Sequence, residues 1–96
     1  MIEHTVTFRL KHGTGSPEER LFLAEASELV AIPEVVEFLI RRQTSPKLDH
    51  TFGISMWFAN HADYEAYNAH PDHTAFLEKR WLTEVVSFQE ADFESL

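Results

Sequence analysis

The chain has 96 residues, enough for one hydrophobic core, and we expect a single domain over residues 1–96. Its formal net charge of −8 would repel phosphate backbones, which argues against nucleic acid as a partner. Cysteine is absent, which excludes disulfide and thiolate chemistry. No signal peptide and no apolar run of ~18 residues stand out, so we expect a cytoplasmic protein without a membrane partner.

The first predicted strand covers Ile2 to Leu10, where apolar and polar residues alternate. Every second residue from Ile2 would face the core, and His4 is the polar exception on that face. A helix is then predicted from Pro17 to about Ala31, because serine at position 16 suits the cap, proline suits the first turn and Glu19 completes a capping box.

Two further strands are predicted in the middle of the chain, over residues 35–42 and 51–59. The polar segment between them is short and contains Pro46, so we expect an antiparallel hairpin. Asn60 would then cap a helix over residues 61–69.

Pro71 divides the last part of the chain. It disfavours helical geometry at His70 and can begin a new helix, which we expect to run to about residue 82. Residues 84–93 have the pattern of a fourth strand. The element order β-α-β-β-α-β predicts an α+β, ferredoxin-like fold with a four-stranded antiparallel sheet.

Two helices can cover only one face of such a sheet. The uncovered face would carry a mixed, partly apolar set of side chains: Thr5, Thr7, Leu39, Gly53 and Trp57, with Val86 and Phe88 as further candidates. An exposed patch of this kind usually marks an interface. We therefore expect a two-fold symmetric homodimer in which two sheets pack face to face.

Two segments of the chain form a recognisable pair: His4-x-Val6-x-Phe8 near the start and Tyr67-Asn68-Ala69-His70-Pro71-Asp72-His73-Thr74-Ala75-Phe76 near the end. Together they resemble the stress-responsive A/B barrel domain (Dabb) family. The resemblance implies a dimeric α+β barrel. Most members of that family have no established reaction, one group consists of heat-stable plant stress proteins that form rings of dimers, and another is a plant polyketide cyclase that performs a cofactor-free intramolecular aldol condensation.

The resemblance to the cyclase also implies roles for individual residues. A tyrosine and the second histidine of the H-P-x-H element perform its chemistry, and a strand-one histidine lines its pocket. These fall on Tyr67, His73 and His4 in this sequence. The cyclase has a further pocket histidine where this chain carries Phe52, so its substrate does not transfer.

The residues themselves suggest the same chemistry. His73 would lie in the first helical turn after Pro71, where a neutral imidazole can act as a general base near pH 7. The Tyr67 hydroxyl could hold a carbonyl oxygen on which negative charge develops, provided that the break at Pro71 turns both side chains toward one cavity. The expected substrate contacts are His4, Phe8, Phe52, Ile54 and Phe76.

Structural roles are the competing interpretation for each of these residues, and His70 is expected to cap a helix. The other three histidines, His12, His50 and His61, are expected to be exposed. His70-x-x-His73 has a spacing used for metal ligands, but the helix break separates the pair and no third ligand stands nearby. We therefore expect no metal and no cofactor.

Three functions remain open from the sequence. The first is cofactor-free acid–base catalysis of the cyclase, aldol or isomerase type on a small, partly apolar carbonyl compound. The second is a non-enzymatic stress-protection or ligand-binding dimer. The third is a cofactor-free monooxygenase, which Trp57 and Trp81 suggest.

Overall fold

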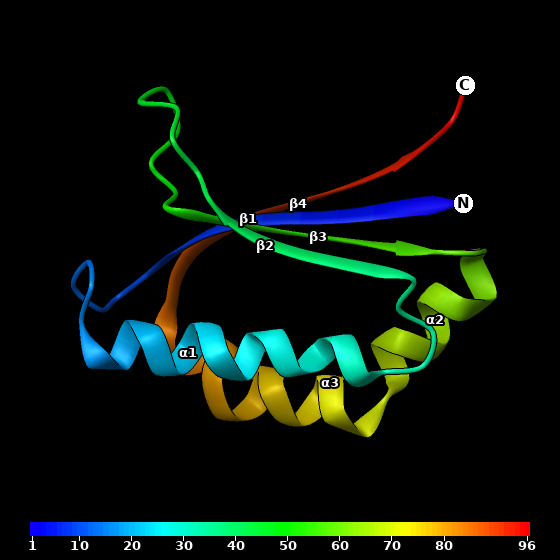
Figure 1. Ribbon diagram of the computed structural model, residues 1–96, viewed down its shortest axis with the longest axis horizontal. Coiled ribbons are helices and arrows are strands. Elements are labelled where there is room, and N and C mark those ends of the chain that lie inside the picture. The colour runs from blue at the N-terminus through cyan, green and yellow to red at the C-terminus, as the bar shows by residue number, and fades with distance from the viewer.

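Four antiparallel strands form the sheet of the structure, a computed structural model that describes all 96 residues (Figure 1). The strands are β1 (Ile2–Leu10), β2 (Glu37–Arg42), β3 (Phe52–Phe58) and β4 (Val85–Glu94). Their order across the sheet is β2-β3-β1-β4, and each neighbouring pair is antiparallel. The predicted β-α-β-β-α-β ferredoxin-like fold is confirmed.

All helices lie against one face of this sheet, and the other face is left uncovered (Figure 1). The longer helices are α1 (Pro17–Ser27), α2 (His61–Ala69) and α3 (Pro71–Phe76). Short turns extend them: a 3₁₀ turn η1 (Glu28–Ala31), a π-helical turn η2 (Leu77–Trp81) and α4 (Leu82–Glu84). No helix has both the length and the apolar content needed to cross a membrane.

The three longer helices begin where the sequence predicts, because a side chain caps each of them. The Ser16 hydroxyl accepts a hydrogen bond from the Glu19 amide (3.2 Å), and the Asn60 side chain accepts one from Asp63 (2.8 Å). At α3 the cap is His70, whose Nδ1 accepts from the Asp72 amide at 3.1 Å. The expectation that His70 caps is confirmed.

The helix after Pro71 differs from the prediction of one continuous helix to about residue 82. It passes through the π turn η2, which places one extra residue in the turn and shifts the faces on which later side chains lie. Trp81, the last residue of this turn, is buried, and its ring centroid lies 5.1 Å from that of Phe8. Local sequence spacing cannot predict the π turn, because it is the tertiary packing of the Trp81 indole that stabilises it.

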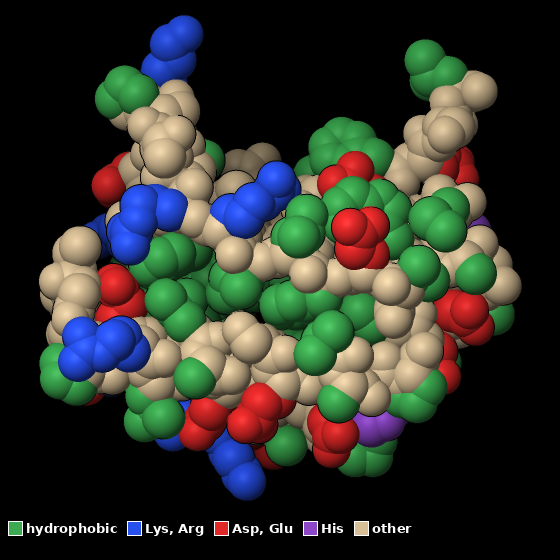
Figure 2. Space-filling view, in the orientation of Figure 1, with side chains coloured by type: hydrophobic (Ala, Val, Ile, Leu, Met, Phe, Trp, Pro, Cys, Tyr) green, Lys and Arg blue, Asp and Glu red, His purple; other side chains and the backbone are tan.

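The hydrophobic core fills the space between the sheet and the helices. Phe8, Phe22 and Phe58 are completely buried there. Phe8 lies at the centre of an aromatic cluster, with the rings of Phe22 and Phe52 at 5.7 and 5.8 Å. On the surface, hydrophobic side chains gather along the seam between the sheet and the helical layer (Figure 2).

The uncovered face of the sheet carries Thr5, Thr7, Gly53 and Trp57, as the alternation of the strands predicts. The prediction that Phe88 lies on this face is wrong. It pairs in register with Phe8, and its ring meets Trp81 edge-on at 5.5 Å, so it lies on the helix side.

A β-bulge explains the wrong assignment of Phe88. The pairing of β1 with β4 shifts between Arg9 and Leu10, so that Val86 lies within the bulge. Beyond the shift, Ser87, Gln89, Ala91 and Phe93 occupy the uncovered face.

Two of the histidines that were expected to be exposed are in fact buried or half-buried. His50 lies on the uncovered face, with Nδ1 at 2.9 Å from the Thr7 hydroxyl and Nε2 at 2.9 Å from that of Ser87. His12 is half-buried, with Nε2 at 2.6 Å from a carboxylate oxygen of Glu84. Both were misplaced because their partners are distant in the sequence; His61 is exposed as expected.

Candidate functional site

A cavity of about 260 Å³ lies between the sheet and the helices. Ten of its thirteen lining residues are hydrophobic. The other three are His4, His73 and Glu90, and Tyr67 adds a hydroxyl group. An apolar cavity with a few convergent polar groups is the usual form of a small-molecule site.

The break between α2 and α3 brings Tyr67 and His73 together. His70 has an extended conformation (φ −64°, ψ 135°), and α3 starts directly after it at Pro71. On an unbroken helix, side chains six residues apart would diverge. Here the two ring centroids are 4.5 Å apart, and both side chains line the cavity.

The protonation of His73 is set by one hydrogen bond. Its Nδ1 lies 3.1 Å from the backbone carbonyl oxygen of Asn68. A carbonyl oxygen can only accept, so Nδ1 carries the hydrogen, and in the neutral ring Nε2 keeps its lone pair. Burial lowers the pKa of His73 below its ordinary value of 6.5, an effect that the Asn68 carbonyl only partly offsets. His73 is therefore a neutral base at pH 7.

Tyr67 is the complementary donor. Its side chain is buried and lines the cavity, and no hydrogen bond joins its hydroxyl to another group of the chain. Burial raises the pKa of the Tyr67 phenol, and the charge of Glu90 raises it further. The hydroxyl therefore stays protonated and can donate to an oxygen atom of a ligand.

His4 is held by two residues outside the cavity lining. Its Nδ1 donates to Asp92 Oδ1 at 2.7 Å and lies 2.7 Å from the Tyr64 hydroxyl oxygen. The Tyr64 hydroxyl in turn donates to the Asp92 carboxylate at 3.0 Å. This arrangement fixes the orientation of the His4 ring and places a hydrogen on Nδ1, and the ring centroid lies 6.4 Å from that of Tyr67.

Three of the five predicted substrate contacts, His4, Ile54 and Phe76, line the cavity together with Tyr67 and His73. Phe8 and Phe52 do not line it, which corrects their assignment. Both are buried in the core, where they pack against each other. The alternation of β1 correctly places Phe8 on the cavity side, but the cavity extends only over the part of the strand around His4 and Val6.

Tyr64, Glu90 and Asp92 were not predicted as site residues, and Trp81 was considered only as a sign of a monooxygenase. A signal for Tyr64 was its position three residues before Tyr67, on the same helix face. A signal for the two acids was the alternation of β4, which places both on the side of Phe88. Trp81 lines the cavity, whereas Trp57 lies on the opposite face of the sheet, so the two tryptophans share no site.

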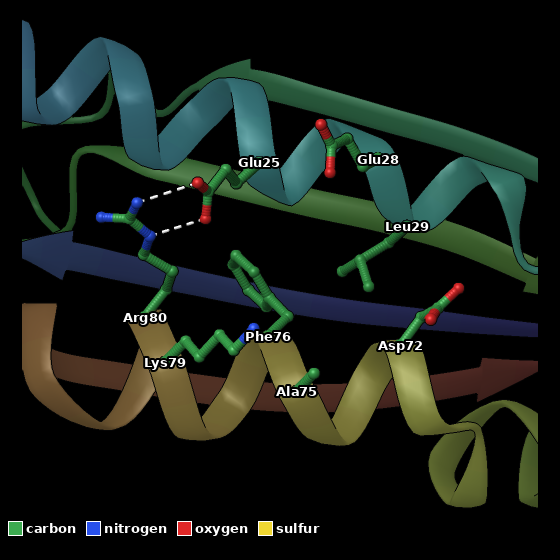
Figure 3. Close-up of a pocket in the computed structure, with 8 residues that line it drawn as sticks. All are labelled: Glu25, Glu28, Leu29, Asp72, Ala75, Phe76, Lys79 and Arg80. Carbon is green, nitrogen blue, oxygen red and sulfur yellow. Dashed lines mark hydrogen bonds and ion pairs between the residues drawn. The ribbon is translucent and has the colours of Figure 1, made fainter.

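A second hollow, of about 510 Å³, runs along the surface between α1 and α3 (Figure 3). Arg80 crosses it and binds both carboxylate oxygens of Glu25, at 2.6 and 2.8 Å, which lowers the pKa of Glu25. The charges of Arg80 and Glu25 neutralise one another, so we place the candidate site in the smaller, apolar cavity instead. Leu29 and Phe76 line both hollows and form the wall between them.

Metal ligation has no candidate centre here. No three histidine, aspartate or glutamate side chains come close enough together to hold a metal ion. His70 and His73, which have a ligand-like spacing, are engaged separately, with the Asp72 amide and the Asn68 carbonyl.

Comparison with known proteins gives one family for nearly the whole chain. The family model described as "Stress responsive A/B Barrel Domain" (Dabb) matches residues 2–95. The crystal structure of a Dabb family protein with a ferredoxin-like fold from Mesorhizobium loti is 51% identical. It aligns over 99% of this chain and 96% of that chain with a TM-score of 0.97. Among curated proteins, no sequence matches the chain.

More distant structures share the fold. A hydroxynitrile lyase from Passiflora edulis has a TM-score of 0.81 at 17% identity, covering 99% of this chain and 95% of that one. A dimeric ferredoxin-like protein of unknown function from Thermobifida fusca has a TM-score of 0.79 at 23% identity, covering 98% and 90%.

Proposed function

Because the chain belongs to the stress-responsive A/B barrel domain (Dabb) family, with an imidazole and a phenol that converge on an apolar cavity, we propose that it binds a small, partly apolar carbonyl compound there. The proposed chemistry is proton transfer next to the carbonyl group, of the aldol cyclase or isomerase type and without a cofactor. The observation that carries the proposal is the hydrogen bond from His73 Nδ1 to Asn68, because it leaves Nε2 free as a base on a ring that contacts the ring of Tyr67.

In the proposed step, the proton that His73 removes stays within the site and is returned at the end. His73 Nε2 takes a proton from the carbon next to the carbonyl group, and the electron pair of that bond forms a carbon–carbon double bond. The charge moves to the carbonyl oxygen, to which Tyr67 donates a hydrogen bond. The enolate carbon then attacks a second carbonyl group or is reprotonated, and the imidazolium of His73 returns the proton.

His4 has a supporting role in this proposal. Asp92 and Tyr64 engage its Nδ1, so the ring is held at a fixed angle and only Nε2 remains to contact a ligand. It can accept a hydrogen bond from a ligand hydroxyl group. A neighbour of the same fold is described as a hydroxynitrile lyase, which supports the view that this fold can carry an enzyme.

Exchange of carbon-bound protons for deuterium tests the proposal without knowledge of the natural substrate. Phenylacetaldehyde, phenylacetone and cyclohexanone would be incubated with the protein in D₂O and followed by proton NMR. We expect exchange above the buffer rate for at least one compound. Binding without exchange would instead favour the ligand-binding dimer, and absence of both would contradict a site in this cavity.

The pH dependence of exchange follows from the lowered pKa of His73. The imidazole must be neutral to accept a proton, so kcat/KM should rise with pH and reach a plateau. Because burial lowers its pKa, the midpoint should lie below the ordinary value of 6.5. A midpoint above 6.5 in a pH–rate profile would contradict this assignment of the base.

The same shift predicts an effect on stability. In the pH range just below 6.5 the unfolded chain binds more protons at His73 than the folded chain does. Protonation of His73 therefore favours the unfolded chain, and the free energy of unfolding decreases as the pH falls through this range. The His73→Gln variant should lack this part of the pH dependence in urea unfolding.

The uncovered sheet face supports a second part of the proposal, a homodimer. Trp57 is half-buried on this face, near the end of β3, and the similar protein from Thermobifida fusca is described as dimeric. We expect Trp57→Glu to place an unpaired charge in the contact and shift the mass in solution from about twice 11.1 kDa to that of one chain. Light scattering after gel filtration measures the molar mass, and Trp57→Phe is the control that should stay dimeric.

A further inference from the structure

The carboxylate of Glu90 enters the cavity lining without a partner. Glu90 lies opposite Val6 in the pairing of β4 with β1, which places it on the helix side of the sheet. Its side chain forms no hydrogen bond and no ion pair within the chain, and the residue is exposed. It therefore lies at the mouth of the cavity, in contact with both solvent and the lining.

The neighbouring acid on the same strand face has a different situation. Asp92 is engaged by the imidazole of His4 and the hydroxyl of Tyr64. Glu90 is the only acidic residue in the cavity lining, and no group of the protein pairs with its charge. Its field reaches into the cavity, since it raises the pKa of both Tyr67 and His73, although burial is the larger influence on each.

The rest of the lining offers no lysine or arginine among its thirteen residues. The Nδ1 atoms of the two histidines are engaged by Asp92 and by the Asn68 carbonyl. A carboxylate, phosphate or phosphate-bearing thioester would meet the like charge of Glu90 and no lysine or arginine. A hydroxyl or ammonium group would find an acceptor in Glu90.

We infer that Glu90 restricts the cavity to carbonyl compounds that are uncharged or carry an amino group, and excludes anionic ones. This inference rests on the proposed function and narrows its substrate class. Tyr67 and His73 would hold the reacting carbonyl end, and the end of the ligand near the mouth would be a hydrogen-bond donor to Glu90.

Three small probes of nearly equal size test this selectivity: benzylamine, benzyl alcohol and benzoate. Binding would be followed by proton–nitrogen NMR of the wild-type protein, which contains two tryptophans. The indole N–H of Trp81 reports occupancy of the cavity, and that of Trp57, on the opposite sheet face, serves as an internal reference. The Trp57→Phe variant assigns the two signals.

The variant to compare is Glu90→Gln, with Glu94→Gln as the matched control. Glu94 lies on the same strand and the same face, opposite Ile2, but does not line the cavity. Both substitutions change the net charge equally. In the wild type we expect benzylamine to bind at least about fivefold tighter than benzoate at low salt. Glu90→Gln should bring this ratio close to one, and Glu94→Gln should leave it unchanged.

The binding results distinguish failure of the Glu90 selectivity from failure of the proposed catalytic function. A ratio that Glu90→Gln leaves intact, or a wild type that prefers benzoate, overturns the selectivity inference while the proposed catalytic function stands. An equal loss of the ratio in Glu94→Gln assigns the effect to net charge and overturns it as well. If none of the probes shifts the Trp81 signal, the cavity is not a ligand site, and both proposals fall.

Discussion

The His73→Gln variant is expected to lose deuterium exchange by about 10²- to 10⁴-fold, the usual contribution of a positioned general base. Glutamine approximates the length of the side chain and can keep a hydrogen bond to the Asn68 carbonyl, but it has no basic nitrogen at neutral pH. The measurement is the exchange rate of the best carbonyl compound under saturating and limiting concentrations.

His61→Gln is the matched control for this variant. His61 is an exposed residue at the start of α2, so the same chemical change there should leave the exchange rate intact. Thermal unfolding should show that both variants fold. A His73→Gln protein that retains wild-type exchange would show that another group is the base, and His4 would be the next candidate because it is the other histidine that lines the cavity.

Tyr67→Phe is expected to lower the exchange rate by about 10²- to 10³-fold, because it removes a preorganised donor to the developing oxyanion. The phenyl ring keeps the packing, and the hydroxyl makes no hydrogen bond within the chain, so stability should change little. The loss should appear in kcat more than in KM, since the hydrogen bond strengthens as negative charge develops on the oxygen.

Tyr64→Phe is the control that separates a direct role of the Tyr67 hydroxyl from the effect of removing any tyrosine hydroxyl from α2. Tyr64 lies one turn earlier on α2, and its hydroxyl contacts Asp92 and His4 but does not line the cavity. We expect only a few-fold loss of rate from it, through looser positioning of His4. Equal losses in the two variants would contradict a direct role for Tyr67.

Local sequence signals predict the fold and the part of the site that depends on neighbouring residues. The alternation of β1 gives both the strand and the inward position of His4. Pro71 gives the helix break, and the caps at Ser16 and Asn60 give the helix starts. Tyr67 and His73 are close in sequence, so a break between them is enough to suggest that they converge.

The rest of the site depends on pairings that no local pattern contains. The contact of His4 with Asp92 joins residues 88 positions apart and requires the register of β1 with β4. That register includes a bulge, which is why Phe88 was assigned to the wrong face. The extent of the cavity, which leaves out Phe8 and Phe52, depends in turn on how the π turn places Trp81 beside Phe8.

The state of the His73 imidazole in the folded protein decides whether this residue can be the base. Nitrogen NMR of the histidine rings distinguishes the two neutral forms and gives each titration midpoint. At pH 7 we expect a neutral His73 ring with its proton on Nδ1, a midpoint below 6.5, and an Nε2 signal that moves when benzyl alcohol fills the cavity. A ring that is charged at pH 7, or that carries its proton on Nε2, would show that His73 is not the base.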